Sequence, residues 1–138
     1  MTLTDAGPLI ALIDADEADH ERCREALASL RLPLLTTWPA FTEAIYLLGR
    51  AAGWAGQDPL WRLVQRGDLV VESLSTNAVE WTARLMKKYA ELPMDLADAT
   101  LVALAQEYDL RQVFTLDAGF HVYRFRGRGR FQVVPALG

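Results

Sequence analysis

The segment MDLADATLVALA, residues 94–105, carries two aspartates three positions apart in an otherwise apolar stretch. A helix that is apolar on all sides is typical of a buried helix. Asp98 shares its helical face with Leu101, Val102 and Ala105, so its carboxylate has no polar face from which to reach water. A buried carboxylate is costly unless it is hydrogen-bonded, paired or bound to a cation. The segment therefore predicts that another part of the fold compensates for Asp98.

Three further acids are placed so that they can meet Asp98. Asp5 follows the first predicted strand, Asp117 follows the predicted strand that contains VFTL, and Glu43 lies early in the helix that Pro39 opens. If these strands run parallel, their carboxyl ends lie at one edge of the sheet and the four carboxylates converge there. Mg²⁺ or Mn²⁺ binds oxygen ligands of this kind. Such a cluster suits phosphodiester hydrolysis, in which the metal activates a water and orients the scissile phosphate.

Each of these acids also has a purely structural interpretation. An aspartate after a strand is a common helix N-cap, so Asp5 and Asp117 can be caps or ligands. Glu43 can be a half-solvated side chain on its helix. Asp95 follows Pro93-Met94 and is expected to cap the helix that contains Asp98. Asp98 is the acid for which a structural role is hardest to find.

The two histidines do not favour a metal-free ribonuclease. His20 lies in the charged segment DADEADHERCRE and is expected to be solvated, while His121 lies beside the basic C-terminal end without an obvious second histidine. Metal-free RNA cleavage usually needs a histidine pair or a histidine and a glutamate as acid and base. The acidic residues are therefore the better candidates for catalysis.

The segment VYRFRGRGRF, residues 122–131, has two interpretations. Its arginines alternate with aromatic residues and glycines. Arginine binds phosphate through two parallel hydrogen bonds and aromatic rings stack on unpaired bases, which favours an RNA-binding strip with Arg124 and Arg126 as phosphate contacts. The same pattern also suits a solvated loop or an edge strand that carries protective charges.

The acids and arginines are embedded in alternating strands and helices. The predicted strands cover 2–5, 32–37, 69–74, 111–117 and 130–137, and the predicted helices cover 9–14 after a turn at 6–8, 18–30, 39–52, 57–67, 75–92 and 95–109. This alternation indicates an α/β fold with a mainly parallel sheet and helices on both faces. No linker divides the chain, so residues 1–138 are expected to form a single domain.

The composition narrows the class of protein. The chain has a net charge of −4 and a single cysteine, Cys23, which excludes a disulfide framework and a four-cysteine zinc site. We find no secretory signal and no stretch long enough to cross a membrane, so we expect a cytoplasmic protein with Cys23 in its core. The mean hydropathy of +0.07 is high for a small monomer and hints at a surface that a partner covers.

Taken together, four segments of the chain resemble the acidic motifs of PIN-domain proteins, in particular the VapC toxins of bacterial toxin–antitoxin pairs. These segments are LTDAGPLIALI, FTEAIYLL, MDLADATLVALA and VFTLDAGFHVYR, which occur in the family's order over nearly the whole chain. The resemblance implies a three-layer α/β/α domain with Mg²⁺- or Mn²⁺-dependent endoribonuclease activity on RNA. It also implies a homodimer and a cognate antitoxin whose tail fills the active site.

The resemblance assigns roles to individual residues. Asp5, Glu43 and Asp98 match the acids of the first three motifs, and Asp117 matches the first acid of the fourth. All four are expected to be catalytic, with Asp5 and Asp98 as the principal metal ligands and Asp95 as a supporting acid behind them. Hydrolysis by an activated water does not use the ribose 2′-hydroxyl, so the expected products carry 5′-phosphate and 3′-hydroxyl ends.

One position departs from the family pattern. The fourth motif often has a second acid before phenylalanine, but here Gly119 precedes Phe120. The departure puts a second metal ion in question and is the main support for a rival interpretation, a PIN-like module that binds RNA or protein without cutting it. A housekeeping nuclease without an antitoxin is a further rival. Growth arrest on expression, relieved by a small neighbouring protein, would favour the toxin.

Overall fold

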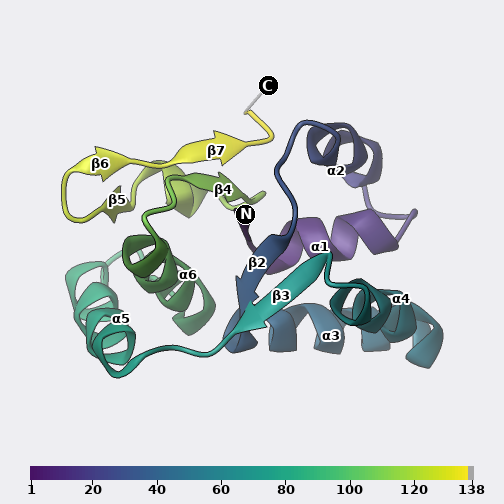
Figure 1. The fold of residues 1–138 in the computed structure, drawn as a ribbon, viewed down its shortest axis with the longest axis horizontal. Coiled ribbons are helices and arrows are strands. Elements are labelled where there is room, and N and C mark those ends of the chain that lie inside the picture. The colour runs from purple at the N-terminus through teal and green to yellow at the C-terminus, as the bar shows by residue number, and fades with distance from the viewer. Residues whose placement is uncertain (137–138) are drawn as a thin grey trace.

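A five-stranded parallel sheet forms the centre of the molecule in the computed structural model, which describes residues 1–136 (Figure 1). In the order β3–β2–β1–β4–β7, the strands span Leu69–Glu72, Leu34–Thr37, Thr2–Thr4, Gln112–Phe114 and Gln132–Val134. All four neighbouring pairs are parallel, as the alternation of strands and helices predicts. The first strand therefore lies in the middle of the sheet, next to the strand that leads toward Asp117.

Six α-helices accompany this sheet. They span Ala6–Ile13 (α1), His20–Leu27 (α2), Trp38–Ala52 (α3), Trp54–Gln65 (α4), Thr76–Lys88 (α5) and Leu96–Tyr108 (α6). Within residues 1–136, none of them has the length and apolar character needed to cross a membrane. In Figure 1, α5 and α6 lie together on one side of β2 and β3, while α1, α3 and α4 lie on the other.

Two apolar clusters hold the helices against the sheet. Leu35 faces the cluster built mainly by α5 and α6, whereas its neighbour Leu34 faces the cluster built mainly by α1, α3 and α4. This follows from the two-residue period of a strand, which sends successive side chains to opposite faces. Cys23 is buried in the second cluster, as expected. The result is the α/β/α layering that the resemblance implies.

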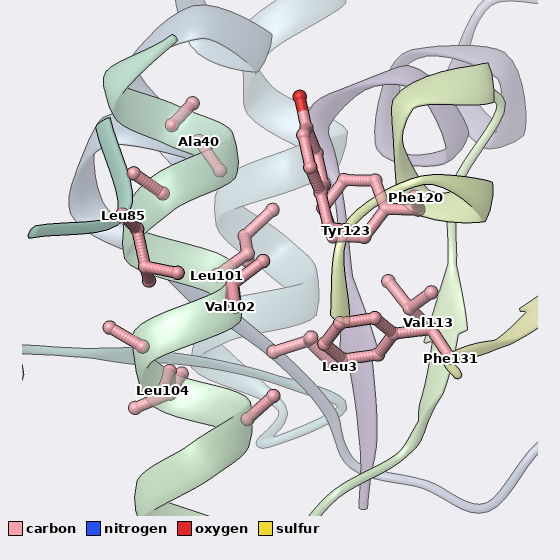
Figure 2. Packing of buried hydrophobic residues seen from close by; sticks show 14 of the residues in the cluster. Leu3, Ala40, Leu85, Leu101, Val102, Leu104, Val113, Phe120, Tyr123 and Phe131 are labelled. Carbon is pink, nitrogen blue, oxygen red and sulfur yellow. The ribbon is translucent and has the colours of Figure 1, made fainter. Parts of the chain in front are cut away.

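Helix α6 is the most deeply buried helix of this part of the chain. Every residue from Ala97 to Ala105 is buried, Asp98 included. Figure 2 shows Leu101 and Val102 of this helix facing Leu3, Val113 and the aromatic residues of the C-terminal segment. The prediction of a buried helix is confirmed. The Asp98 carboxylate is buried with it, so its burial has to be compensated elsewhere in the fold.

Two helices, α1 and α4, begin three residues earlier than the sequence indicates. Helix α1 starts at Ala6, so the predicted turn at 6–8 is its first turn, in which Pro8 fits without losing a hydrogen bond. Helix α4 starts at Trp54, directly after Gly53, and includes Pro59 in its interior. The Asp-Pro pair that suggested a helix start therefore marks a position where the helix lacks one backbone hydrogen bond.

The C-terminal segment contains a hairpin that the sequence analysis did not anticipate. Strands β5 (Arg124–Phe125) and β6 (Gly129–Arg130) pair antiparallel, and Gly127 turns between them with φ of 76°. The sheet strand β7 then follows as a separate element. The predicted strand 130–137 is thus shorter than expected, and its last residue, Leu137, lies outside the described residues.

Candidate metal centre

Three aspartates from distant parts of the chain meet at the carboxyl edge of the sheet. Asp5 follows β1 and Asp117 follows β4, and these strands are parallel neighbours in which the Asp5 N–H donates to the carbonyl of Phe114 at 2.9 Å. Asp98 approaches from the first turn of α6. One carboxylate oxygen from each of Asp5, Asp98 and Asp117 lies within 4.8 Å of the other two. The parallel sheet therefore brings these three acids together, and we call them the acid cluster.

The two other acids of the sequence analysis lie at the rim of the same cleft. The cleft has a volume of about 250 Å³ and is lined by Asp5, Gly7, Glu43, Asp95, Asp98, Leu116 and Asp117. Glu43 and Asp95 are exposed, unlike the buried Asp5 and Asp98. Among residues 1–136, no lysine, arginine or histidine lies within ion-pair distance of any of these five carboxylates.

Asp5 and Asp117 act as helix caps and as members of the acid cluster at once. Asp5 Oδ1 accepts from the Ala6 N–H at 2.7 Å, and Asp117 Oδ1 accepts from the Gly119 N–H at 2.8 Å. The Thr115 hydroxyl donates to Asp5 Oδ2 at 2.9 Å and accepts from the Asp117 N–H at 3.0 Å. Because each carboxylate oxygen has two lone pairs, these bonds orient the side chains without removing their capacity to bind a cation.

Asp98 is held by a residue that the sequence analysis did not select. Its side chain is buried, with 5% of the residue exposed, and its Oδ2 accepts from the Tyr123 hydroxyl at 2.9 Å. Asp95, by contrast, behaves as predicted, since its Oδ1 caps α6 by accepting from the Asp98 N–H at 2.8 Å. The cap fixes the first turn of α6, and so the place from which Asp98 reaches the cluster.

Three acids of the cleft, Asp98, Asp5 and Glu43, ionise less readily than free carboxylates when no cation is bound. Burial raises the pKa of Asp98 to about 8, and the neighbouring charge of Asp5 adds to the shift. Burial also raises the pKa of Asp5 to about 6, although the bonds from Ala6 and Thr115 oppose it. Burial and the charge of Asp95 raise the pKa of Glu43. Like charges confined in a poorly hydrated cleft disfavour one another, and a cation would reverse this effect.

These residues fit a hard divalent cation. The ligand atoms on offer are all carboxylate oxygens, with no cysteine or histidine in the acid cluster, which suits Mg²⁺ or Mn²⁺ better than zinc. The lack of a cationic side chain within ion-pair distance, noted above for residues 1–136, leaves the buried negative charge without a protein counter-ion. A bound divalent cation would supply that counter-ion.

The two arginines selected as phosphate contacts lie in different surroundings. Arg124 Nη1 donates to the carbonyls of His121, Val122 and Tyr123 at 2.7–3.2 Å. Arg126 donates to the Gln106 carbonyl at 2.9 Å, near the C-terminal end of α6. Because a helix rises 1.5 Å per residue, that carbonyl is roughly 12 Å along the axis from Asp98. The structure does not bring Arg126 to the acid cluster.

The aromatic residues between these arginines belong to the core. Tyr123, Phe125 and Phe131 are 3%, 1% and 7% exposed. The interpretation that they stack on RNA bases is therefore wrong, because their rings already pack against one another and against Phe120. The expectation that His20 is solvated is also wrong, since its Nδ1 lies 2.6 Å from the Ala11 carbonyl and its ring is largely covered.

Sequence comparison places this chain among known proteins. Residues 2–126 match the profile of the PIN domain. The chain is also similar to Ribonuclease VapC26 of Mycobacterium tuberculosis, with 31% identity over 134 residues that cover 96% of this chain and 99% of that protein.

Comparison with solved structures shows the same fold. VapC20 of Mycobacterium tuberculosis, described as a toxin that cleaves the sarcin–ricin loop, aligns with a TM-score of 0.77 at 19% identity, over 85% of this chain and 90% of that one. A toxin–antitoxin complex from Klebsiella pneumoniae aligns with a TM-score of 0.65 at 18% identity, over 85% and 87% of the two chains. FitAcB from Neisseria gonorrhoeae aligns at 0.58 with 24% identity, over 86% and 89%.

Proposed function

Because the chain belongs to the PIN-domain family, we propose that it is a divalent-metal-dependent endoribonuclease of the VapC toxin type. The convergence of Asp5, Asp98 and Asp117 within 4.8 Å carries this proposal. Burying two acids of like charge, Asp5 and Asp98, destabilises a fold, so they need a compensating role. Binding the cation of a hydrolytic site provides that role.

The acids have different roles in the metal site, which follow from how deeply each is buried. Asp5 and Asp98 are the principal metal ligands, while Asp117 and Glu43 complete the site directly or through water, with Asp95 in support. When bound, the cation supplies a Lewis acid that makes water easier to deprotonate and offsets the negative charge of the phosphate. Thr115 and the backbone N–H groups of Ala6 and Gly119 keep the carboxylates in place. Arg124 is better placed than Arg126 to contact an RNA phosphate, because it directly follows Tyr123.

The proposal predicts metal-dependent cleavage of RNA. End-labelled single-stranded RNA should be cut in Mg²⁺ or Mn²⁺ and left intact in EDTA, and the products should carry 5′-phosphate and 3′-hydroxyl ends. Asp5→Asn, which keeps the capping oxygen but removes the charge, should abolish cutting. Asp16→Asn, the same change at an exposed aspartate outside the cleft, is the matched control and should cut normally.

Two outcomes would contradict the mechanism. Cleavage that persists in EDTA would show that the reaction needs no bound cation. A 2′,3′-cyclic phosphate on the product would show that the ribose hydroxyl attacks instead of an activated water. If RNA stays intact while Mg²⁺ raises the melting temperature, the metal site is real and the RNA tested is the wrong substrate. If neither changes, the rival of a binding module without catalysis is favoured.

An antitoxin is the proposed protein partner. The similarity to VapC26 and to a chain from a toxin–antitoxin complex supports it. The cleft presents five carboxylates without a bound cationic side chain from the described residues, so it would attract a basic side chain from an antitoxin tail. We propose that the antitoxin binds in the cytoplasm, where a protein with one buried, unpaired cysteine is stable.

We also propose a homodimer, which would cover an exposed apolar hollow beside the cleft. Trp38 and Leu96 are 47% and 51% exposed, and they line an open hollow of about 500 Å³ that also includes Glu43 and Asp95. Exposed aromatic residues at the edge of a functional site are typical of protein interfaces. A second copy seated here would leave the acids at the border of the two chains.

Sedimentation equilibrium tests the dimer. The wild-type protein should sediment at twice its chain mass of 15.4 kDa, and Leu96→Glu should sediment as a monomer because it places a charge in the interface. An acidic residue in the first turn of α6 suits the helix dipole, so the variant should fold. The control, Leu32→Glu, changes a comparably exposed leucine before β2 and should remain dimeric. A monomeric wild-type protein would reject the dimer.

The rival interpretation of a non-cutting module is less well supported than the nuclease. It rested on Gly119, where the family pattern often has a second acid. Gly119 donates its N–H to Asp117 and lies against Tyr123, so the position is part of the framework around the acid cluster. The cluster itself keeps Asp5 and Asp98 buried, which a binding module has no reason to do.

A further inference from the structure

The carboxylate of Asp98 depends on a hydroxyl from a remote part of the chain. The Tyr123 hydroxyl donates to Asp98 Oδ2 at 2.9 Å, across 25 residues of sequence. Within the part of the chain that the structure describes, no other hydroxyl or amide donates to this carboxylate. Asp5 and Asp117, in contrast, each accept from a nearby backbone N–H. Asp98 is therefore the one member of the acid cluster whose described donor is a side chain alone.

The Tyr123 side chain is held rigidly. Its ring packs edge-on against Tyr89 and Phe120, with ring centres 5.1 Å and 5.2 Å away, and the residue is 3% exposed. Its backbone N–H donates to the Gly119 carbonyl at 3.0 Å. Figure 2 shows the ring beside Phe120 and its hydroxyl oxygen pointing out of the apolar cluster, at the end away from Leu104. A hydroxyl on so constrained a ring can hold a carboxylate in one orientation.

Gly119 provides the space for this hydroxyl. A Cβ atom at position 119 would lie 2.8 Å from Tyr123 Oη, closer than Cβ atoms approach other atoms in proteins, and 3.0 Å from Tyr123 Cζ, which is also tight. Any other residue at this position would therefore displace the tyrosine. Gly119 also donates its N–H to Asp117 Oδ1. The short 3-10 turn Ala118–His121 thus serves two acids, holding Asp117 directly and allowing Tyr123 to reach Asp98.

We propose that Tyr123 is a positioning residue for the metal site, because its hydroxyl fixes the Asp98 carboxylate in the orientation that faces Asp5 and Asp117. Gly119 is required for this contact, since it leaves the space that the hydroxyl occupies. A hydrogen bond behind a ligand sets the ligand's orientation and commonly governs metal affinity. The glycine that departs from the family pattern is then coupled to the tyrosine four residues later. As far as RNA cleavage is concerned, this inference rests on the proposed function; as far as metal binding is concerned, it rests on the acid cluster alone.

Tyr123→Phe is the direct test, because it keeps the ring and removes only the hydroxyl. Calorimetric titration with Mn²⁺ should show an affinity about tenfold weaker than that of the wild-type protein. At saturating Mn²⁺, kcat for RNA should fall by about tenfold while KM for RNA stays within about twofold, since the tyrosine does not contact the substrate. A purely structural tyrosine would lower the melting temperature and leave the Mn²⁺ affinity unchanged.

Tyr89→Phe is the matched control. Tyr89 packs against Tyr123, and its hydroxyl accepts from the Arg124 N–H at 3.0 Å instead of touching an acid. This variant removes a hydroxyl from the same aromatic group, so it should cost similar folding stability. Its Mn²⁺ affinity should equal that of the wild-type protein.

The role of Gly119 is tested by a double-mutant cycle. Gly119→Ala should weaken Mn²⁺ binding as Tyr123→Phe does, because the added methyl group displaces the hydroxyl. The double variant should bind Mn²⁺ no more weakly than either single variant, since both changes remove one interaction. Losses that multiply would show that Gly119 acts independently of Tyr123.

The outcomes separate this inference from the proposed function. Wild-type Mn²⁺ affinity in Tyr123→Phe overturns the positioning role, whatever the nuclease assay shows. If the wild-type protein binds Mn²⁺ but cuts no RNA, the proposed nuclease function fails while the affinities still decide the role of Tyr123. If the wild-type protein does not bind Mn²⁺, the metal site and the positioning role are rejected together.

Discussion

Asp98→Asn is expected to abolish RNA cleavage and, without metal, to leave the protein as stable as the wild type or more stable. Asparagine keeps the size of the side chain and an oxygen for the Tyr123 hydroxyl, but it loses the charge that binds the cation. Metal stabilisation of a transition state supplies several kcal/mol, so the rate should fall by about three orders of magnitude or more. The free energy of unfolding in EDTA should rise by roughly 1–3 kcal/mol near neutral pH, because asparagine needs neither a buried charge nor the proton that folded Asp98 takes up to avoid one.

The two halves of this expectation are measured separately. Cleavage of labelled RNA in Mn²⁺ gives the loss of activity, and urea unfolding in EDTA gives the change in stability. Glu107→Gln is the matched control, since it removes one negative charge from an exposed site on the same helix and should change neither quantity. A large loss of stability in Asp98→Asn would mean that the Asp98 carboxylate stabilises the folded protein without metal. The burial of Asp98 would then no longer argue for a bound cation.

The elements of the fold were predictable where the local sequence pattern agrees with the way in which the element packs in the tertiary structure. Helix α6 was predicted to be buried because no polar residue surrounds Asp98 on its helical face. Asp95 was predicted to cap this helix because it follows Pro93-Met94. The alternation of short apolar strands with helices indicated the parallel sheet. From that sheet followed the meeting of Asp5 with Asp117, since parallel neighbours end at the same edge.

Of the two interpretations of the C-terminal segment, the one in which its aromatic rings stack on RNA is wrong, because it rested on composition instead of period. In Tyr123-Arg124-Phe125-Arg126 the aromatic residues and arginines alternate, which is the period of a strand with one buried face. That alternation already indicated rings turned to the core and arginines turned to solvent. The interpretation as an RNA-binding strip attended to the residue types alone and therefore placed buried rings at a surface.

The supporting donors of the acid cluster could not be read from the sequence. Thr115 bonds Asp5 across 110 residues, and Tyr123 bonds Asp98 across 25. Such contacts depend on which strands are neighbours and on how one short turn is closed, and local spacing records neither. Gly119 carried the only signal, as a glycine at a position where the family pattern often has an acid.

Without metal, the free energy of unfolding should fall as the pH rises from about 5 to about 8. The folded-state pKa values of Asp98 and Asp5 are raised to about 8 and about 6, above the ordinary aspartate value of 3.8. Between about pH 4 and pH 8 the folded protein therefore holds more protons at these sites than the unfolded chain does. Their contribution to stability is present at low pH and is lost as the pH rises through the folded-state values. In EDTA, each carboxyl group that is protonated in the folded protein but ionised in the unfolded chain lowers the free energy of unfolding by up to about 1.4 kcal/mol per pH unit.

A bound cation favours the ionised carboxylates, so it should cancel this fall. At a metal concentration one hundred times the Kd, the gain in stability is about 2.7 kcal/mol. Metal binding strengthens as the acids deprotonate, so the gain should be largest near pH 8 and smallest near pH 5. Urea unfolding across this range, in EDTA and in Mn²⁺, measures both curves. The difference between wild type and Asp98→Asn reports Asp98 together with its coupling to Asp5, because the surface acids contribute equally to the two proteins. If the wild-type and Asp98→Asn curves in EDTA run parallel from pH 5 to pH 8, Asp98 does not titrate as a buried acid. The cation would then not be what compensates for its burial in α6.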